Sequence, residues 1–379
     1  MGDKNEQERQ KNSRERVMRV QFNAVLKDVT RKGTKIQTDE YLTEGKFPII
    51  DQGNNDIAGY RDDETGLFTD VPAIVFGDHT RIVKYITEPF FLGADGVKVL
   101  VPIDRTMNCK YLYYQLLSAK IPDTGYNRHF KWVKELEFQL PSRNEQDDVV
   151  KRLDKLCVVI SARQQQLAKL DELVKARFVE MFGQYSEDSK LSNVATVSGG
   201  LTKNAKRDKL ALRMPYLRVA NVAFATIDIS EMLHIGLTNE ELEKTLLQKG
   251  DLLFVEGNGS PDQIGRVAIW NDEVTPCVHQ NHLIKARFNH EIVLPVFAMH
   301  YFMSVRGREQ IKSKAVSTSG LYTLSVSKIS DLLLPVPPLN LQKKFALLVE
   351  YTGKIKLFVQ KSIEQMEIMK KALMQQYFG

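Results

Sequence analysis

The sequence predicts an α/β (α+β) fold in which two globular mixed modules alternate with two long helices. Three observations predict this fold: the end of the chain repeats an internal stretch, a heptad pattern leads up to both copies, and short runs rich in β-branched residues fill the remainder. The chain has 379 residues, of which 43% are hydrophobic and 26% charged, so it can bury two separate cores.

The repeat has a fixed offset, because Gly379 lies 196 residues after Gly183 and each follows a phenylalanine. At this offset the two copies align without a gap over about forty residues. The matched pairs are Pro141/Pro337, Asn144/Asn340, Gln146/Gln342, Asp154/Glu350, Gln164/Gln360, Leu170/Met366, Lys175/Lys371, Ala176/Ala372 and Phe182/Phe378. We therefore expect the two segments to fold alike.

A weaker similarity continues upstream in the same order. The paired stretches are Leu26–Val29 with Leu191–Val194, Phe47–Ile50 with Met214–Leu217, Ala73–Gly77 with Leu252–Gly257, and Thr124–Tyr126 with Ser319–Leu321. This order indicates a shared scaffold whose details differ between the two copies. In chain order we expect a flexible tail (1–16), a first module (17–140), a first long helix (141–183), a second module (184–336) and a second long helix (337–379).

The tail is polar and has no apolar stretch that would suit a signal peptide, and the chain has no run of about 18 apolar residues. Three separated cysteines show no pairing pattern, which favours a reducing cytoplasm.

Each module is expected to contain many short strands and one short helix. The clearest strand signals are Ala73–Phe76, Arg81–Ile86, Val97–Val101, Leu252–Val255 and Arg266–Trp270. The short helices are expected over Cys109–Leu117 and Val296–Met303.

The long helices carry apolar residues at alternating steps of three and four, which is a heptad seam. In the first helix the seam consists of Val149, Leu153, Leu156, Ile160, Leu167, Leu170, Val174 and Met181. In the second helix it consists of Phe345, Val349, Val359, Ile363, Met366, Leu373 and Tyr377, with polar interruptions. Ser142 and Glu145 form a capping-box pattern, Asn340 is a candidate cap, and both glycines suit helix ends. We expect the seams to pair within the chain; the alternative is that each helix packs only on its own module.

The module loops are rich in side chains that bind DNA. Arginine reads guanine, asparagine and glutamine read adenine, and lysine and hydroxyl groups hold phosphates. A net charge of +6 favours a polyanionic partner. The candidate DNA-binding residues are Asp78, His79, Thr80, Arg81, Lys84, Tyr126, Asn127, Arg128, His129 and Lys131 in the first module, and Arg218, Asn221, Asn258, Ser260, Arg266, Gln280, Asn281, His282, Ser317, Thr318 and Tyr322 in the second.

Enzyme and metal motifs are incomplete. The only Pro-Pro pair, Pro337-Pro338, precedes a helix and lacks the Asn or Asp of an adenine-methyltransferase motif. The sequence has no Gly-x-x-x-x-Gly-Lys-Ser/Thr loop, and the glycine-rich stretch 254–259 has the wrong spacing for a cofactor. Glu44-Gly-Lys46 is at most half a nuclease signature, and Cys277, His279 and His282 lack a second cysteine pair for zinc. We expect no catalytic centre and no metal site.

With these features the chain resembles the specificity subunit of Type I restriction–modification systems. The resemblance is carried by Val197–Thr202, Pro215–Val222, Gly250–Phe254, Ile264–Ala268 and the proline-rich exits Leu140–Gln146 and Leu334–Gln342, together with the two Phe-Gly helix ends. No single motif is specific; their order, occurring twice, is.

The resemblance implies that each module is a target recognition domain for one half of a bipartite double-stranded DNA site. It implies that the helices pair as an antiparallel coiled coil, set the spacer and dock two methyltransferase subunits, with restriction–translocase subunits around them. The expected docking residues are Leu153, Leu167, Leu170, Phe178, Ile363, Met366, Leu373 and Phe378.

The resemblance places cofactors only in the partners: S-adenosylmethionine in the methyltransferase, and ATP and magnesium in the motor. It also implies a prokaryotic cytoplasmic protein associated with the nucleoid and not with a membrane. One alternative function is a non-catalytic scaffold whose coiled coil joins proteins and whose modules bind peptides, and a second is a fragment of an enzyme fusion.

Overall fold

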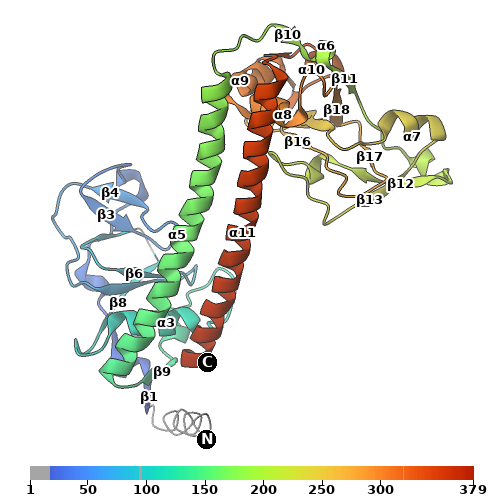
Figure 1. The fold of residues 1–379 in the computed structure, drawn as a ribbon. Coiled ribbons are helices and arrows are strands. Elements are labelled where there is room, and N and C mark those ends of the chain that lie inside the picture. The colour runs from blue at the N-terminus through green and yellow to red at the C-terminus, as the bar shows by residue number, and fades with distance from the viewer. Residues whose placement is uncertain (1–17, 94–95, 319) are drawn as a thin grey trace, which may run out of the picture. The chain divides into compact units, whose positions relative to one another are not determined.

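A computed structural model describes residues 18–93, 96–318 and 320–379, so the expected tail (1–16) lies outside the described residues. The chain divides into two compact units, unit 1 from residues 1–164 and 361–379, and unit 2 from residues 165–360. Each unit holds one globular module and part of both long helices, which Figure 1 shows in green and red. The predicted fold class, two mixed modules with two paired long helices, is confirmed.

Unit 1 is built around the four-stranded sheet β2-β8-β5-β6 and the three-stranded sheet β4-β3-β7. Its strands are β1 (Met18–Gln21), β2 (Leu26–Asp28), β3 (Phe47–Ile50), β4 (Gly59–Arg61), β5 (Ala73–Gly77), β6 (Val83–Ile86), β7 (Phe91–Leu92), β8 (Val97–Pro102) and β9 (Glu137–Leu140). Its short helices are α2 (Phe22–Val25), η1 (Thr30–Lys32), η2 (Thr38–Glu40), α3 (Cys109–Ser118) and α4 (Phe130–Val133). The predicted strands at Ala73–Phe76 and Val97–Val101 and the predicted helix over Cys109–Leu117 are confirmed here, whereas the strand expected over Arg81–Ile86 begins only at Val83.

Unit 2 contains the sheets β11-β18-β14-β16, β13-β12-β17, β15-β20-β19 and β10-β21. Its strands are β10 (Ser189–Lys190), β11 (Ala195–Ser198), β12 (Arg213–Leu217), β13 (Leu233–Gly236), β14 (Leu252–Val255), β15 (Gly257–Asn258), β16 (Val267–Ile269), β17 (Val278–His279), β18 (Leu283–Phe288), β19 (Val316–Thr318), β20 (Leu321–Thr323) and β21 (Leu333–Leu334). Its short helices are α6 (Leu191–Val194), η3 (Ala205–Lys209), η4 (Val219–Asn221), α7 (Asn239–Thr245), α8 (Pro295–Met303), α9 (Val305–Lys314) and α10 (Val326–Ser330).

The two modules share one scaffold down to strand register. Sheet β4-β3-β7 corresponds to β13-β12-β17, and in both the central strand has one antiparallel and one parallel neighbour. Ile49 pairs with Phe91 in the first module, and Tyr216, its expected counterpart, pairs with Val278 in the second. The order predicted from the weaker upstream similarity is therefore correct for this strand.

One upstream pairing was wrong by four residues. Leu191–Val194 forms the helical turn α6, which runs directly into strand β11. In the first module the same turn-then-strand arrangement begins at Phe22–Val25, whereas Leu26 starts strand β2. A leucine and a valine three residues apart suit either a helical turn or a strand, so this spacing alone could not fix the alignment.

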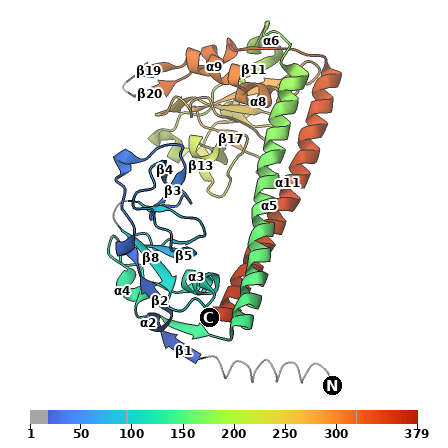
Figure 2. The same ribbon diagram turned by 90° about the vertical axis from the view of Figure 1, so that its left-hand side faces the viewer.

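The long helices are α5 (Arg143–Phe182) and α11 (Leu339–Phe378), which are side by side in Figures 1 and 2. In unit 1, Arg152 Nη1 near the start of α5 donates to the Tyr377 hydroxyl at the end of α11. In unit 2, Lys356 Nζ on α11 lies 2.5 Å from Asp171 Oδ1 on α5. Within unit 1 the start of one helix thus meets the end of the other, which is an antiparallel pairing.

The two helix starts use different caps. Ser142 N donates to Glu145 Oε2 at 2.9 Å, and Glu145 N donates back to Ser142 Oγ at 3.4 Å, so the predicted capping box is confirmed. The predicted cap at Asn340 is wrong because α11 already begins at Leu339, with the Pro338 carbonyl accepting from Leu341 N and Gln342 N. The fixed φ of proline suits this position before the first turn.

A buried glutamine pins each long helix to its own module in the same way. Gln146 Nε2 donates to the Pro141 carbonyl and its Oε1 accepts from Asn108 N, the residue that caps α3. Gln342 Nε2 donates to the Pro337 carbonyl and its Oε1 accepts from Leu294 N, which precedes α8. The aligned repeat therefore reflects one structural joint used twice.

Both expected modes of helix packing occur. Leu153 of α5 is fully buried in the core of unit 1. In unit 2, Phe178 and Phe182 of α5 and Phe345 of α11 are buried in the core formed with the sheet β11-β18-β14-β16 and α8. The helices thus pair with each other and also complete the cores of the modules.

Candidate nucleic-acid interface

The first module brings two of its predicted loops together, one after β5 (77–82) and one between α3 and α4 (119–129). Asp78 and His129 form the base of this arrangement: the Asp78 carbonyl accepts from His129 N at 2.8 Å, and Asp78 Oδ1 accepts from Phe130 N at 2.7 Å. Both side chains are buried. They hold the loops in place, and we do not propose them as DNA contacts.

Arg81 also acts within the protein. Its Nη2 lies 2.7 Å from Asp123 Oδ2 and its Nη1 donates to the Ile121 carbonyl at 3.4 Å. The backbone N–H of Gly125, and secondly the Arg81 charge, lower the pKa of Asp123. Arg81 therefore ties the two loops together, and its expected role as a base-reading side chain stays a prediction.

Lys84 is likewise turned inward, because its Nζ donates to the Asn55 carbonyl and lies 3.4 Å from Asp51. Thr80 Oγ1 donates to the Gln52 carbonyl at 2.7 Å. Besides Thr80, the predicted residues of this module that remain exposed on the loops and at the start of α4 are Tyr126, Asn127, Arg128 and Lys131. His79, half-buried, stacks against Tyr126.

The second module gathers several predicted residues on the small sheet β15-β20-β19. Asn258 pairs with Tyr322, and Tyr322 pairs with Ser317 on the other side. Ser260 follows β15, and its backbone N donates to Asn258 Oδ1 at 2.9 Å. The side chain of Thr318 lies outside what the structure describes.

The turn Gln280–His282 lies at the base of the same sheet. Glu256 links them, because its Oε2 lies 2.8 Å from His282 Nδ1 while its backbone carbonyl accepts from Leu324 N, next to β20. His282 is exposed, and Gln280 and Asn281 are half-buried. Half-buried Arg266, which precedes β16, donates to Gln263 Oε1 at 3.3 Å.

Arg218 and Asn221 are structural. Arg218 Nη2 lies 3.0 Å from Glu231 Oε2. Asn221 is buried, accepts from Arg218 N and donates to the carbonyls of Asp228 and Glu231. We therefore do not propose Asn221 as a DNA contact.

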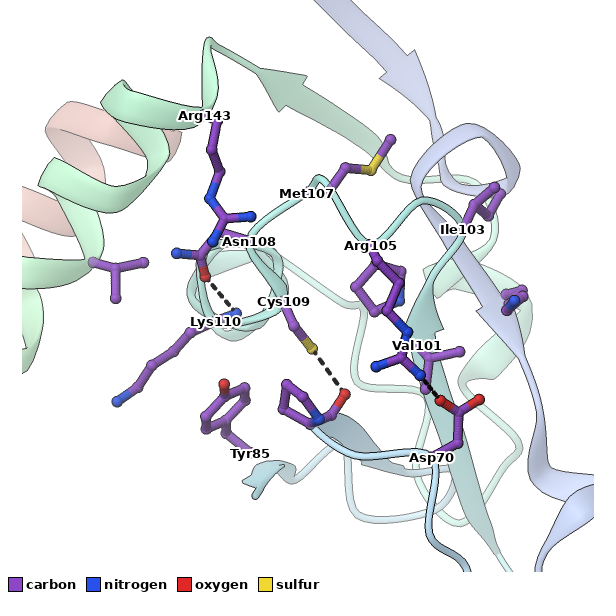
Figure 3. Close-up of a pocket in the computed structure, with 14 residues that line it drawn as sticks. Asp70, Tyr85, Val101, Ile103, Arg105, Met107, Asn108, Cys109, Lys110 and Arg143 are labelled. Atoms are coloured by element: carbon purple, nitrogen blue, oxygen red, sulfur yellow. Dashed lines mark hydrogen bonds and ion pairs between the residues drawn. The ribbon is translucent and has the colours of Figure 1, made fainter. Parts of the chain in front are cut away.

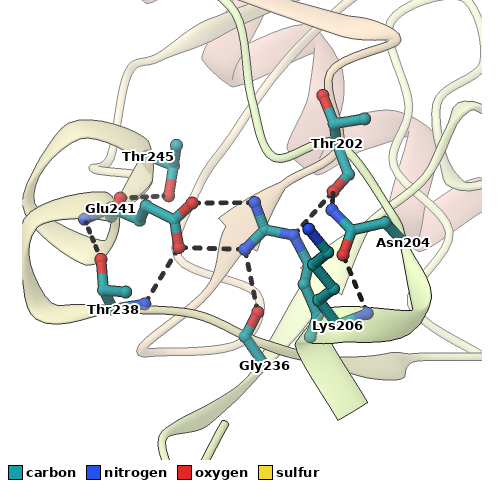
Figure 4. A network of polar contacts seen from close by, with 8 residues as sticks. Thr202, Asn204, Lys206, Gly236, Thr238, Glu241 and Thr245 are labelled. Carbon is teal, nitrogen blue, oxygen red and sulfur yellow. Dashed lines mark hydrogen bonds and ion pairs between the residues drawn. The ribbon is translucent and has the colours of Figure 1, made fainter. Parts of the chain in front are cut away.

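The sequence reading missed a basic segment around η3. Lys203, Lys206 and Lys209 are all exposed there. The segment is held by Arg207, whose guanidinium makes two hydrogen bonds of 2.8 and 2.9 Å to Glu241 and donates to the carbonyls of Thr202 and Gly236. Figure 4 labels Thr202, Gly236 and Glu241 in this network. The Arg207 hydrogen bond is the largest cause that lowers the pKa of Glu241. Three lysines within seven residues were the available signal.

Several expected docking residues on the long helices are used internally. Leu153 and Phe178 are buried in the module cores, and Phe378 packs edge-on against Tyr111 with ring centroids 5.3 Å apart. Leu373 lies against the core of unit 1. Leu167, Leu170, Ile363 and Met366 are half-buried. The burial of Leu153 and Phe178 corrects their expected availability to another subunit.

An exposed apolar stripe lies elsewhere on α11. Leu347, Tyr351, Ile355 and Phe358 follow each other at steps of four, four and three, so they share one face of the helix, which we call the α11 outer face. Their exposed fractions lie between 47% and 70%. The corresponding positions of α5 are Lys151, Lys155, Val159 and Ala162, which is a mostly polar set.

A cavity of about 410 Å³ in unit 1 offers no chemistry of its own (Figure 3). Three of its cations are already paired: Arg105 with Asp70, Lys110 with Asp154, and Arg143 with Asp147. Burial raises the pKa of the Cys109 thiol to about 12, which leaves it a poor nucleophile at neutral pH.

The three residues considered for zinc, Cys277, His279 and His282, do not point toward a common site. His279 Nδ1 contacts the Leu283 carbonyl at 2.9 Å, the Cys277 thiol donates to the Val278 carbonyl, and His282 faces Glu256. Across the described ranges, no group of three or more His, Cys, Asp or Glu side chains could hold a metal. No helix among the described residues is long and apolar enough to span a bilayer.

A family model described as Type I restriction modification DNA specificity domain matches the chain twice, over residues 23–172 and 185–365. A putative type I restriction enzyme MjaX specificity subunit of Methanocaldococcus jannaschii is 25% identical over 183 residues, which cover 48% of this chain and 42% of that protein. The type I restriction enzyme EcoKI specificity subunit of Escherichia coli K12 is 23% identical over 239 residues, with 57% and 50% covered. The chain spans about half the length of the curated relatives it matches.

Two solved structures are similar over nearly their whole length. The crystal structure of a Type I restriction–modification S subunit from M. genitalium has a TM-score of 0.57 at 15% identity, covering 96% of this chain and 97% of that one. A structure from a study of complex assembly and conformational transition of the type I R-M system has a TM-score of 0.58 at 12% identity, covering 95% and 97%. At these identities the likeness concerns the fold alone.

Proposed function

Because the chain belongs to the family of Type I restriction modification DNA specificity domains, we propose that it is the DNA-recognition subunit of such a complex. Each module recognises one half of a bipartite double-stranded site. The observation that carries this proposal is the double match of the family model on two modules with the same strand register. The duplicated scaffold supports two similar binding events, and the differing loops support two different half-sites.

The proposed DNA contacts come from the exposed loops. In the first module they are Tyr126, Asn127, Arg128 and Lys131, with His79 beside them. In the second they are the β15-β20-β19 sheet with Asn258, Ser260, Ser317 and Tyr322, the turn Gln280–His282, and the lysines of 203–209. Positive side chains around polar and aromatic ones suit a surface that holds phosphates and reads base edges.

We further propose that the α11 outer face docks a methyltransferase subunit. An exposed helix face with four large apolar residues leaves apolar surface in water, and covering it recovers about 25 cal/mol per Å². Changing Phe358 to Asp, a residue 70% exposed, removes this contact without opening a core. Co-purification with the methyltransferase should be lost for Phe358→Asp and retained for Val305→Asp, an equally exposed valine on α9.

The paired helices set the spacer in this proposal. Each is 40 residues, or about 60 Å long at 1.5 Å per residue, which exceeds one turn of B-DNA at about 34–36 Å. Inserting four residues, about one helical turn, at Ala168 should lengthen the gap between the half-sites or abolish binding. An unchanged gap would count against the role of the helices as a ruler.

We propose that the chain itself performs no catalysis. Methyl transfer from S-adenosylmethionine and ATP- and magnesium-dependent translocation and cleavage belong to partner subunits, in a prokaryotic cytoplasm. Methyltransferase activity in the purified chain alone would overturn this part of the proposal.

The deciding experiment is to map methylated bases genome-wide when the chain is co-expressed with its methyltransferase. We expect one motif split into two parts by a fixed gap. The assembled complex should also lose affinity roughly 10³-fold or more between 50 and 200 mM salt if it contacts six or more phosphates. Binding that ignores salt, or no split motif, would favour the alternative of a protein-binding scaffold.

A further inference from the structure

The tip of the loop 119–129 presents one unusually exposed aromatic ring. Tyr126 is 88% exposed, the largest exposed fraction among the exposed large hydrophobic side chains of the described residues. Single exposed apolar residues are common on protein surfaces and need no function by themselves. A second observation is therefore needed before Tyr126 can be assigned a role.

That second observation is the way the ring is held. The imidazole of His79 stacks against the Tyr126 ring with centroids 4.7 Å apart and planes inclined by 9°. His79 Nδ1 also contacts the Asn127 carbonyl at 3.2 Å, so the imidazole is fixed to the loop that carries the tyrosine. One face of the Tyr126 ring is covered by His79, and its high exposure leaves the other face open.

The loop itself is braced on both sides of Tyr126. The Arg81 guanidinium holds Asp123, and the Asn127 side-chain amide donates to the Thr124 carbonyl. Gly125 has φ +74°, a left-handed conformation that glycine adopts without strain. A ring oriented in advance loses little conformational freedom on binding, which favours affinity.

The surroundings indicate which partner the open face would suit. Arg128 and Lys131, both exposed, follow Tyr126 within five residues. Among the described residues neither side chain makes an ion pair, and Lys131 Nζ lies over the Trp132 ring, 4.9 Å from its centroid. An open aromatic face beside cations suits a ligand that carries both flat bases and phosphates.

We propose that Tyr126 enters the base stack of the half-site recognised by the first module and unstacks one base step, with His79 as its backing. Side chains inserted between base steps in this way kink DNA and widen the contact surface. This inference rests on the proposed function and adds to it a deformation of the DNA at a defined residue. It also adds stacking, a contact that tolerates different bases, beside the hydrogen bonds that distinguish them.

The test uses the full chain assembled with its methyltransferase and duplexes of the mapped site that carry 2-aminopurine at each adenine of both half-sites in turn, except the bases that the methyltransferase itself flips out to methylate. Unstacking raises 2-aminopurine fluorescence. We expect a rise at one position of a single half-site for the native chain and for Tyr126→Phe, and no rise for Tyr126→Ala. Affinity should fall roughly 5- to 150-fold for Tyr126→Ala, which corresponds to the loss of one stacked base.

Two further variants separate the possible causes. If the tyrosine hydroxyl merely bonds a phosphate, Tyr126→Phe will bind as weakly as Tyr126→Ala, and the proposal fails. His79→Ala should reduce the fluorescence rise, because it removes the backing of the ring. The thermal midpoint of Tyr126→Ala should stay at the native value, because the Tyr126 ring is almost fully exposed. Native binding to a split site with no fluorescence rise at any position would refute the wedge and leave the proposed function intact; absence of DNA binding would instead refute the proposed function.

Discussion

Replacing Gln342 with methionine should destabilise unit 2 selectively. Gln342 is fully buried and makes three hydrogen bonds: its Oε1 accepts from Leu294 N at 2.8 Å, and its Nε2 donates to the carbonyls of Pro337 at 2.8 Å and Ile292 at 2.9 Å. Methionine has a similar length and no amide. The change therefore leaves two carbonyls and one backbone N–H without partners in a buried place.

The magnitude follows from these three groups. An orphaned buried polar group costs about 1–3 kcal/mol, so three such groups cost roughly 3 kcal/mol even if each lies at the lower limit. For a unit of about 200 residues, 1 kcal/mol shifts the thermal midpoint by about 2–4 °C. We therefore expect a fall of about 6–12 °C.

The chain offers a convenient assay because its only tryptophans are Trp132 in unit 1 and Trp270 in unit 2. In a Trp132→Phe background, the fluorescence of buried Trp270 reports unit 2 alone. Gln360→Met, at an exposed position of the same helix, is the matched control and should change the midpoint by less than 2 °C. A shift for Gln342→Met no larger than that of the control would refute the reasoning that this joint holds the helix to the module.

Three other predictions follow from particular contacts. Gln146→Met should destabilise unit 1 by about 2 kcal/mol, which is less than Gln342→Met, because the Gln146 side chain makes two hydrogen bonds instead of three. Calorimetry with separate transitions for the two units would show this difference. Equal losses of stability for the two variants would contradict the prediction. Burial lowers the pKa of His279 and of His300 to about 4, so folded unit 2 keeps both neutral while the unfolded chain protonates them near 6.5. The unfolded state then binds more protons between these two pH values, so the free energy of unfolding falls as pH drops from 6.5 to 4, by up to about 3 kcal/mol per histidine. Above pH 7 these two groups do not change the stability. Denaturation at pH 7.5 and at pH 5 tests this, and His300→Phe should weaken the pH dependence. Lys206→Ala should lower the slope of log affinity against log salt by about 0.9, whereas Lys169→Ala on α5 should leave it unchanged; equal slopes for both would remove the η3 lysines from the interface.

The fold was largely predictable because its strongest signals are periodic or repeated. Continuous buried runs such as Ala73–Phe76 identify strands, and α3 was expected over Cys109–Leu117 and observed over Cys109–Ser118. The ungapped alignment also placed Gln146 opposite Gln342, which proved to be the same joint in both modules. Weak motifs were less reliable, as the four-residue error at Leu26 shows, because short hydrophobic spacings suit more than one local structure.

The candidate site was predictable only in part, because composition does not reveal the direction of a polar side chain. Asp78, Arg81 and Asn221 were expected to contact DNA, yet each is bonded to groups of its own module. Closely packed loops have buried backbone groups that need partners, and polar side chains nearby supply them. The same residue types therefore serve either the loop or a ligand, and only the three-dimensional contacts distinguish the two uses.

The helices show the same limit from the apolar side. A heptad pattern shows which apolar residues share one face of a helix. It does not show whether that face packs against the partner helix, against the module or against solvent. Leu153 and Phe178 face module cores, whereas the stripe from Leu347 to Phe358 faces solvent and lies outside the expected docking set. What recurs between the two copies is the joint whose partners are backbone carbonyls of Pro141 and Pro337, because backbone atoms are present whatever side chains surround them. Solvent-facing positions carry no such constraint and are free to differ between the two copies, as Tyr351 and its repeat counterpart Lys155 do.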